Sequence, residues 1–172
     1  MPAHGVVCTG KPHPGERAGS QPMVRYECIT RSPNQTYELG RKLGAKLSGG
    51  EIILLHGDLG AGKTLFTKGI GTGLGIEDPS EVVSPSFTLV NIYKARLDIV
   101  HGDLYRLDAD AVYELGLEDY MDQDHVMIIE WAEKARDFFM GNIIDVTLEH
   151  IGESARKVTL TSNRAYFDEG CI

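Results

Sequence analysis

The chain has few cysteines and no long apolar run. Its three cysteines, Cys8, Cys28 and Cys171, stand far apart, which is too few and too scattered for a disulfide framework or a zinc site. Its apolar runs are only a few residues long, whereas a helix that spans a bilayer needs about 20. No apolar segment follows a basic start at the N-terminus, so we expect no secretory signal. These absences predict a cytoplasmic protein that does not enter a membrane.

Dense clusters of lysine and arginine are also lacking. The chain has 17 basic and 25 acidic residues, a formal net charge of −8. Proteins that bind nucleic acid directly usually carry a basic face that contacts the phosphates. We therefore expect no strong direct binding of nucleic acid, and a role in nucleic-acid metabolism would run through a protein partner.

The signatures of several enzyme classes are missing as well. The chain has no Asn-Lys-x-Asp motif, which disfavours a GTPase, and no arginine-rich lid like that of many nucleoside-monophosphate kinases. None of the six histidines pairs with a serine or cysteine in a readable triad, so hydrolase chemistry of that type has no support.

The length and composition are those of one globular domain. Hydrophobic residues make up 42% and charged residues 24% of the 172 residues, which are ordinary values for a domain with a hydrophobic core. Residues 1–22 are rich in Gly, Pro and His without apolar periodicity, so we expect a disordered N-terminal extension. Residues 23–172 then form the single domain, and Met23 is a candidate translation start.

The most informative motif is a phosphate-binding loop over residues 57–64, Gly-Asp-Leu-Gly-Ala-Gly-Lys-Thr. It follows the apolar run Ile52–Leu55 and precedes a predicted helix, as G-x-x-x-x-G-K-[ST] loops do. The glycines let backbone N–H groups surround an anion. Lys63 would reach the β- and γ-phosphates of a nucleotide, and the Thr64 hydroxyl would bind Mg²⁺. The alternative is a glycine-rich turn with a chance lysine, which the flanking strand and helix disfavour.

The order of predicted elements indicates an α/β protein. A helix is predicted to start at Ser32, which is followed by Pro and, three residues on, by Gln. The helix over residues 63–74 contains three interior glycines, which predict that its C-terminal half is weak or short. Close packing of these glycines against a neighbouring element is the expected reason for their presence. Further helices are predicted over residues 110–120, with a break at Gly116, and over residues 132–139. They lie between strands and two pairs of neighbouring strands, and one of these strands is predicted over about residues 87–94. This order predicts a P-loop NTPase-like three-layer fold, a mixed parallel and antiparallel sheet with helices on both faces.

A phosphate-binding loop needs a carboxylate to hold magnesium, usually at the end of a neighbouring strand. Glu130 ends the apolar run Val126–Ile129 and is the better candidate from pattern alone, while Asp103 ends a less apolar strand. The acid that does not hold the metal would orient or deprotonate the attacking water. For either residue alone, a solvated carboxylate at a strand end is the competing interpretation.

Four other positions are ambiguous on the sequence alone. Ser84 and Ser86 flank a proline after a polar loop. They either form a mobile segment that senses the γ-phosphate or simply begin a strand, and the spacing favours the second interpretation. Trp131, the only tryptophan, and His101 are both interpreted as core residues rather than catalytic groups.

Five motifs occur in a characteristic order over about residues 30–160. They are Gly57-Asp-Leu-Gly-Ala-Gly-Lys-Thr64, Ser84-Pro-Ser-Phe-Thr-Leu-Val90, His101-Gly-Asp-Leu-Tyr-Arg-Leu107, Glu114-Leu-Gly-Leu117 and Ile129-Glu-Trp131. Together they resemble the TsaE (YjeE) family, the small bacterial P-loop ATPases of tRNA threonylcarbamoyladenosine biosynthesis. Five ordered motifs make this resemblance far more specific than the phosphate-binding loop alone.

The resemblance implies an ATPase that uses ATP and Mg²⁺, is weak alone and supports the TsaB–TsaD pair. That pair transfers a threonylcarbamoyl group to adenosine 37 of tRNAs that read ANN codons. The family's essential acids match Asp103 and Glu130, and its magnesium-binding hydroxyl matches Thr64. Its nucleotide-binding positions match Asp58, Leu59, Gly60, Ala61, Gly62, Lys63, Thr64, Ser86 and, with a looser match, Arg156.

Two positions depart from the family pattern. The family usually has Thr where Ser86 stands, and since a hydroxyl survives, the nucleotide-sensing role implied for residues 84–86 survives with it. The family usually has a bulky residue where Gly102 stands, and a glycine loosens the strand that ends in Asp103.

Two rival functions stay open on the sequence. One is a small P-loop kinase that acts on a metabolite, and the other is a nucleotide-binding scaffold without useful turnover. A kinase would need an acceptor pocket with basic residues or a lid, and the sequence has no such cluster. The sequence also leaves open which of Asp103 and Glu130 binds the metal directly.

Overall fold

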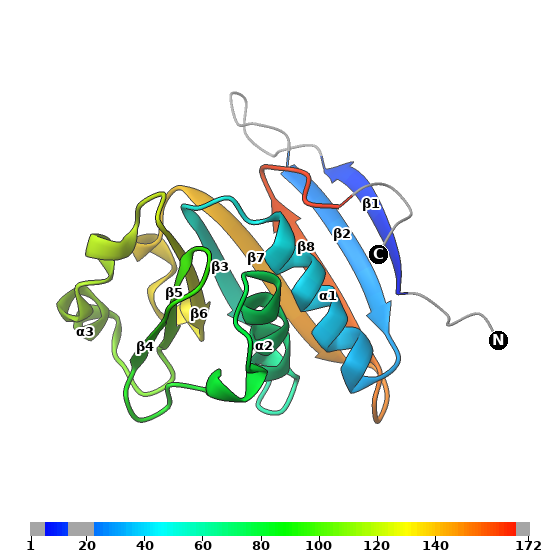
Figure 1. Cartoon of the computed structure of the whole chain (residues 1–172), viewed down its shortest axis with the longest axis horizontal. Coiled ribbons are helices and arrows are strands. Elements are labelled where there is room, and N and C mark those ends of the chain that lie inside the picture. The colour runs from blue at the N-terminus through cyan, green and yellow to red at the C-terminus, as the bar shows by residue number, and fades with distance from the viewer. Residues whose placement is uncertain (1–5, 14–22, 168–172) are drawn as a thin grey trace.

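The computed structural model describes residues 6–13 and 23–167. Within them, one sheet of eight strands runs in the order β1-β2-β8-β7-β3-β6-β5-β4 (Figure 1). The strands are β1 (Val7–His13), β2 (Met23–Thr30), β3 (Glu51–His56), β4 (Val90–Tyr93), β5 (Asp98–Asp103), β6 (His125–Glu130), β7 (Asn142–His150) and β8 (Arg156–Ser162). The central strands β7, β3, β6 and β5 are parallel, while β4 and the β8-β2-β1 group pair antiparallel at the two sides. The predicted mixed sheet is confirmed.

Strand β3 lies in the middle of the sheet because its side chains are apolar on both faces. Its first five residues are buried. Ile53 and Leu55 contact one hydrophobic cluster, whereas Ile52 and Leu54 contact a second cluster on the opposite face. A parallel strand covered on both sides has a continuous apolar run rather than an alternating one, as residues 52–55 do.

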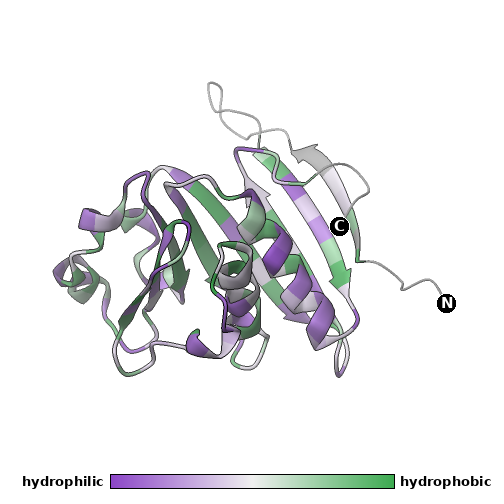
Figure 2. Cartoon of the chain, viewed as in Figure 1, coloured by the Kyte–Doolittle hydropathy of each residue, from purple (hydrophilic) through white to green (hydrophobic). Residues whose placement is uncertain are grey.

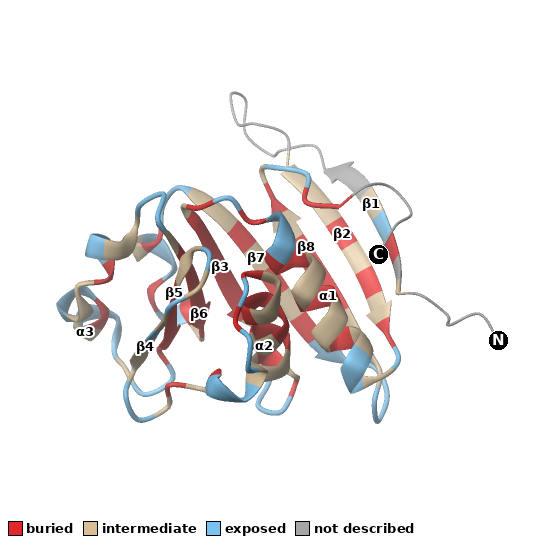
Figure 3. Cartoon of the chain, viewed as in Figure 1, coloured by how far each residue is buried: buried red, intermediate tan, exposed pale blue. Residues whose placement is uncertain are grey.

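Helices pack on both faces of the sheet, as predicted. Figure 1 shows α1 (Pro33–Lys46) and α2 (Lys63–Gly73) together over one face. The other face is covered by α3 (Ala109–Val112) and the 3-10 segments η3 (Leu117–Tyr120) and η4 (Ala132–Phe138). Polar residues lie on the outer side of α1 (Figure 2), and buried residues lie in α2 and the central strands (Figure 3). No helix within residues 6–13 and 23–167 is both long and apolar enough to cross a bilayer.

Helix α1 begins where the sequence predicts. The Ser32 hydroxyl accepts the N–H of Gln35 at 3.2 Å, and the Gln35 side chain accepts the N–H of Arg31 at 2.7 Å. Such reciprocal capping satisfies N–H groups that have no partner inside the helix. At the other end, the Arg96 guanidinium donates to the carbonyls of Gly44 and Leu47.

Helices α1 and α2 touch backbone to backbone through four glycines, which we call the glycine seam: Gly40 and Gly44 of α1, and Gly69 and Gly73 of α2. A Cβ built on any of them would lie 2.1–2.4 Å from a backbone carbonyl oxygen of the facing helix. No side chain fits at that distance in a close-packed interior. The prediction that the second half of α2 is short is wrong, because the helix runs unbroken to Gly73. The expected close packing is confirmed, because Gly69 and Gly73 contact the backbone of α1.

Three elements are shorter or tighter than predicted. The segment 110–120 divides into α3, η2 (Tyr113–Leu115) and η3. The predicted break at Gly116 is confirmed, since Gly116 takes a left-handed φ of 67° between η2 and η3. The segment 132–139 forms the 3-10 helix η4, which is kinked at Ala135. The strand expected over residues 87–94 is limited to β4, because Leu89 has a φ of 68° and donates its N–H to Pro85.

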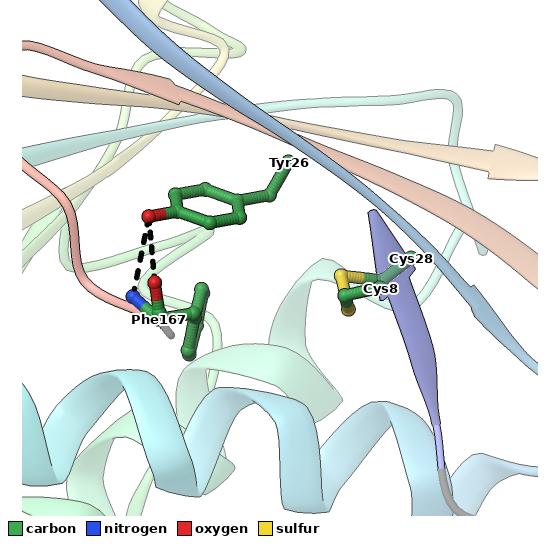
Figure 4. The surroundings of a disulfide bond; sticks show 4 residues. All are labelled: Cys8, Tyr26, Cys28 and Phe167. Atoms are coloured by element: carbon green, nitrogen blue, oxygen red, sulfur yellow. Dashed lines mark hydrogen bonds between the residues drawn. A yellow bond between two sulfur atoms is a disulfide. The ribbon is translucent and has the colours of Figure 1, made fainter. Parts of the chain in front are cut away.

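The expected disorder of residues 1–22 is wrong for Val7–His13, which form β1 alongside β2. Cys8 lies opposite Cys28 in this pairing, and the two form a disulfide bond (Figure 4). The number and spacing of the cysteines did not predict this single bridge, because the two residues come together only through the pairing of β1 with β2. On the same strand, the Tyr26 hydroxyl hydrogen bonds with the backbone of Phe167 (Figure 4). Of the rest of the expected extension, Val6 is described, and residues 1–5 and 14–22 lie outside the described residues.

Candidate functional site

The loop between β3 and α2 has the backbone conformation that phosphate binding requires. Gly57, Gly60 and Gly62 have φ angles of 148°, 79° and 104°, a region that favours glycine. Gly62 is the N-cap of α2, so the free N–H groups and the positive dipole end of that helix lie at the loop. A Cβ on Gly57 would lie 2.6 Å from the Leu148 carbonyl oxygen. This close approach leaves room only for glycine.

Lys63 is oriented by the loop itself. Its Nζ donates to the carbonyl oxygens of Gly57 at 2.6 Å and Asp58 at 3.1 Å. The same atom lies 4.7 Å from the centre of the Trp131 ring, and the residue is 6% exposed. Neutral carbonyls orient the ammonium group without cancelling its charge. Lys63 therefore offers a nearly buried positive charge to an anion.

A cavity of about 440 Å³ opens beside the loop, a volume typical of small-molecule sites. Its lining joins the loop to the ends of β5 and β6 and to the segment before β4. The lining residues are Leu59, Gly60, Gly62, Lys63, Thr64, Leu65, Ser84, Ser86, Asp103, Tyr105, Glu130 and Trp131. They include every site residue that the sequence predicts except Asp58, Ala61 and Arg156.

These three residues lie outside the lining of that cavity. Asp58 is an exposed residue of the loop whose carbonyl oxygen accepts from Lys63. The Nε of Arg156 donates to the Ala61 carbonyl oxygen at 2.9 Å, and both residues line a second cavity of about 40 Å³. Arg156 therefore braces the backbone of the loop.

Asp103 and Glu130 lie side by side at the carboxyl ends of β5 and β6. They are direct partners in the parallel register and are 6% and 4% exposed. Asp103 accepts the Tyr105 N–H on Oδ1 at 2.9 Å, and on Oδ2 it accepts the hydroxyls of Ser84 at 3.2 Å and Ser86 at 3.5 Å. The two acids that the sequence offered as alternatives thus line one cavity together.

Two residues of the site, His101 and Trp131, were interpreted as core, and the lining residues Leu65 and Tyr105 were missed. His101 is buried, as expected, but its Nε2 lies 2.9 Å from Glu130 Oε1. Trp131 has a left-handed φ of 59°, and its ring lies beside Lys63 and 4.9 Å from the Tyr105 ring. His101 had a readable signal, because residues two apart on a strand share a face and Asp103 is two residues on.

Thr64, Asp103 and Glu130 carry the oxygen donors that Mg²⁺ prefers. Within the described part of the chain, no group of three or more His, Cys, Asp or Glu side chains is arranged to hold a metal. A nucleotide-linked Mg²⁺ needs only one or two protein carboxylates, because phosphate oxygens and water complete its coordination. This donor set therefore fits Mg²⁺ bound together with phosphates.

His56 ends β3 and connects the start of the loop to two other elements. Its Nε2 lies 3.1 Å from Asp145 Oδ1 of β7, and its Nδ1 lies 3.3 Å from Glu133 Oε2 of η4. The hydrogen bond to Asp145, aided by the negative charge of both carboxylates, raises the pKa of His56 above its usual 6.5 although burial opposes this. Arg136 also pairs with Asp145, at 3.2 Å.

His56→Gln is expected to destabilise the protein more at about pH 6 than at about pH 8.5. Because the folded-state pKa is raised, this contribution is fully present below the unfolded-state value and disappears as pH rises through the folded-state value. We expect a loss of about 1 kcal/mol at most for such a partly exposed pair. Urea unfolding at both pH values measures the loss, with the exposed His150→Gln as the control. A loss that is equal at both pH values would contradict the assignment.

Sequence comparison identifies related proteins. Residues 30–158 match the family described as "Threonylcarbamoyl adenosine biosynthesis protein TsaE". The tRNA threonylcarbamoyladenosine biosynthesis protein TsaE of a Nostoc species is 41% identical over 131 residues, which are 73% of this chain and 79% of that protein. The protein of the same name from Treponema pallidum is 34% identical over 134 residues, which are 77% of this chain and 98% of that protein. The one from Bacillus subtilis is 34% identical over 141 residues, covering 81% and 87%.

Structural comparison agrees with the sequence. The crystal structure of Bacillus subtilis YdiB superposes with a TM-score of 0.70 at 29% identity, covering 84% of this chain and 90% of that one. The matched residues 30–158 include the phosphate-binding loop, both carboxylates and the central strands that carry them. On these grounds the chain belongs to the TsaE family.

Proposed function

We propose that this protein binds ATP with Mg²⁺ in the cavity of about 440 Å³ and hydrolyses it slowly. One observation supports the proposal most strongly: Lys63 and Thr64 of the loop line the same cavity as Asp103 and Glu130. A loop that cradles phosphates, a hydroxyl for the metal and acids for the metal and the water are the parts that transfer of a phosphoryl group to water requires.

Each group has a distinct part in the proposed reaction. The N–H groups at the start of α2 and the Lys63 ammonium would hold the phosphates and stabilise the charge that develops on them. Thr64 and one carboxylate would hold Mg²⁺, which neutralises charge on the β- and γ-oxygens. The other carboxylate would orient the attacking water and accept its proton. The hydroxyls of Ser84 and Ser86, which donate hydrogen bonds to Asp103, would sense the γ-phosphate.

Membership of the TsaE family supports the assignment of this protein to a biosynthetic pathway. The related proteins are named for tRNA threonylcarbamoyladenosine biosynthesis, and we assign this chain the same pathway. Its partner would be the TsaB–TsaD pair, and the final target of the pathway would be adenosine 37 of tRNAs that read ANN codons. The protein would act in the cytoplasm. A net charge of −8 favours reaching tRNA through a partner rather than by direct contact with its phosphates.

Phosphate release from ATP, with and without the TsaB–TsaD pair, tests this function. We expect slow turnover alone and clear stimulation by the pair. Glu130→Gln should lower release about 100-fold or more under both conditions, since it removes a group that acts on the metal or the water. Release that the pair does not change, together with phosphorylation of a metabolite, would support the rival kinase instead.

A further inference from the structure

His101 is a fully buried imidazole in direct contact with Glu130. Its Nε2 lies 2.9 Å from Glu130 Oε1, and the residue is 0% exposed. The register of β5 and β6 sets this contact, because His101 pairs with Ile128 and Asp103 pairs with Glu130. His101 is therefore the diagonal neighbour of Glu130 on one face of the sheet. Two central strands, rather than a loop, hold the pair together.

The second ring nitrogen of His101 indicates where the ring carries its proton. Nδ1 is buried and has no hydrogen-bond partner within the described ranges of the chain. A proton on Nδ1 would be a buried N–H without an acceptor, which is costly. The proton therefore lies on Nε2, and this N–H donates to the Glu130 carboxylate.

The two carboxylates of the site differ in how their oxygens are used. Both oxygens of Asp103 accept hydrogen bonds, Oδ1 from the Tyr105 N–H and Oδ2 from the hydroxyls of Ser84 and Ser86. Glu130 accepts from His101 through Oε1, and the residue lines the cavity, so we infer that Oε2 is the oxygen that it offers there. Without that bond, the flexible glutamate side chain would sample several orientations.

We propose that His101 is a positioning residue that holds Glu130 with one oxygen directed at the Mg²⁺ and phosphates of a bound nucleotide, an inference that rests on the proposed function. His101 itself touches neither metal nor nucleotide. It acts through the hydrogen bond to Oε1, which orients the carboxylate and keeps that oxygen occupied. Removal of such outer partners of a ligating group typically changes metal affinity or activity 10–100-fold.

Two substitutions separate the hydrogen bond from the volume of the ring. His101→Phe keeps a planar ring in the buried space and removes the donor, whereas His101→Gln restores a side-chain N–H. Trp131 lines the cavity and is the only tryptophan of the chain. Its fluorescence can therefore follow Mg²⁺ binding to the complex with a non-hydrolysable ATP analogue.

We expect His101→Phe to raise the Mg²⁺ concentration for half-saturation about 10–100-fold and to lower kcat by a similar factor. Its affinity for the analogue without Mg²⁺ should stay at the wild-type level, because the phosphate-binding loop is intact. His101→Gln should recover most of both losses. Wild-type Mg²⁺ affinity in His101→Phe would overturn the proposal, as would equal losses in both variants, which would show a purely structural role.

Nitrogen NMR of the wild-type imidazole gives a readout that depends on neither activity nor the folding of a variant. We expect a proton bonded to Nε2 and none on Nδ1, and a proton on Nδ1 alone would overturn the proposal. If the wild-type protein binds the analogue with Mg²⁺ yet releases no phosphate from ATP, the proposed ATPase function fails. The Mg²⁺ titrations and the NMR measurement still decide the role of His101 in that case.

Discussion

Gly69→Ala is expected to cost about 2 kcal/mol or more of folding free energy, although alanine is the better helix former. A Cβ at this position would lie 2.1 Å from the Tyr37 carbonyl oxygen and 2.9 Å from the Arg41 nitrogen. Both atoms belong to the backbone of α1, which cannot rotate away as a side chain can. The two helices must separate to admit the methyl group, and urea unfolding measures the loss.

Gly71→Ala in the same helix is the matched control. The three atoms nearest to its new methyl group all belong to side chains, and the two closest are Ile76 Cδ1 at 3.0 Å and Val82 Cγ2 at 3.2 Å. A gain of about 1 kcal/mol in helix propensity offsets the small repacking, so we expect a stability within about 1 kcal/mol of wild type. Equal destabilisation by both substitutions would contradict the glycine seam. Since Lys63 begins α2, Gly69→Ala should also weaken nucleotide binding.

Lys63→Met is expected to lower the affinity for ATP about 100-fold or more, because it removes charge-assisted hydrogen bonds to the phosphates. Methionine keeps an unbranched apolar stem next to Trp131, so the substitution removes the charge with little loss of packing. Calorimetric titration with a non-hydrolysable ATP analogue and Mg²⁺ measures the change. Circular dichroism confirms that the variant is folded.

Lys68→Met supplies the control for Lys63→Met, because Lys68 lies further along α2 and does not line the cavity. It carries the same change in net charge, so any general electrostatic effect on a polyanion appears in both variants. We expect its affinity to stay close to that of wild type. Undiminished affinity in Lys63→Met, or equal loss in both variants, would refute the assignment of the phosphate-binding loop.

Local signals in the sequence predicted much of the fold. The cap at Ser32, the buried run before Gly57 and the hairpin of β7 and β8 follow from neighbouring residues. The Cys8–Cys28 bridge could not be predicted in this way, because it depends on residues that are distant in the chain. For the glycine seam the sequence predicted close packing of the α2 glycines but not that the facing residues belong to α1. Gly69 and Gly73 disfavour a helix by their local propensity, and their contact with the backbone of α1 explains why glycine stands at both positions.

The candidate site divides in the same way. The loop and the two acids are readable because each stands at the end of a buried strand or in a motif. The contact of His101 with Glu130 needs the register of β5 against β6, which one strand's pattern does not contain. Arg156 was placed with the nucleotide by resemblance. Its hydrogen bond to the Ala61 carbonyl oxygen could not be predicted, because the two residues are 95 positions apart in the sequence.

In the segment before β4, two consecutive residues, Ser86 and Phe87, face opposite ways, one toward the cavity and one toward solvent. Ser86 hydrogen bonds inward to Asp103, while the next residue, Phe87, is 85% exposed and lies 4.8 Å from the Arg106 guanidinium. Neither residue can move far without the other, because one peptide bond joins them. A molecule that pressed on the Phe87 ring and moved its backbone would therefore also move the Ser86 hydroxyl that hydrogen bonds with Asp103.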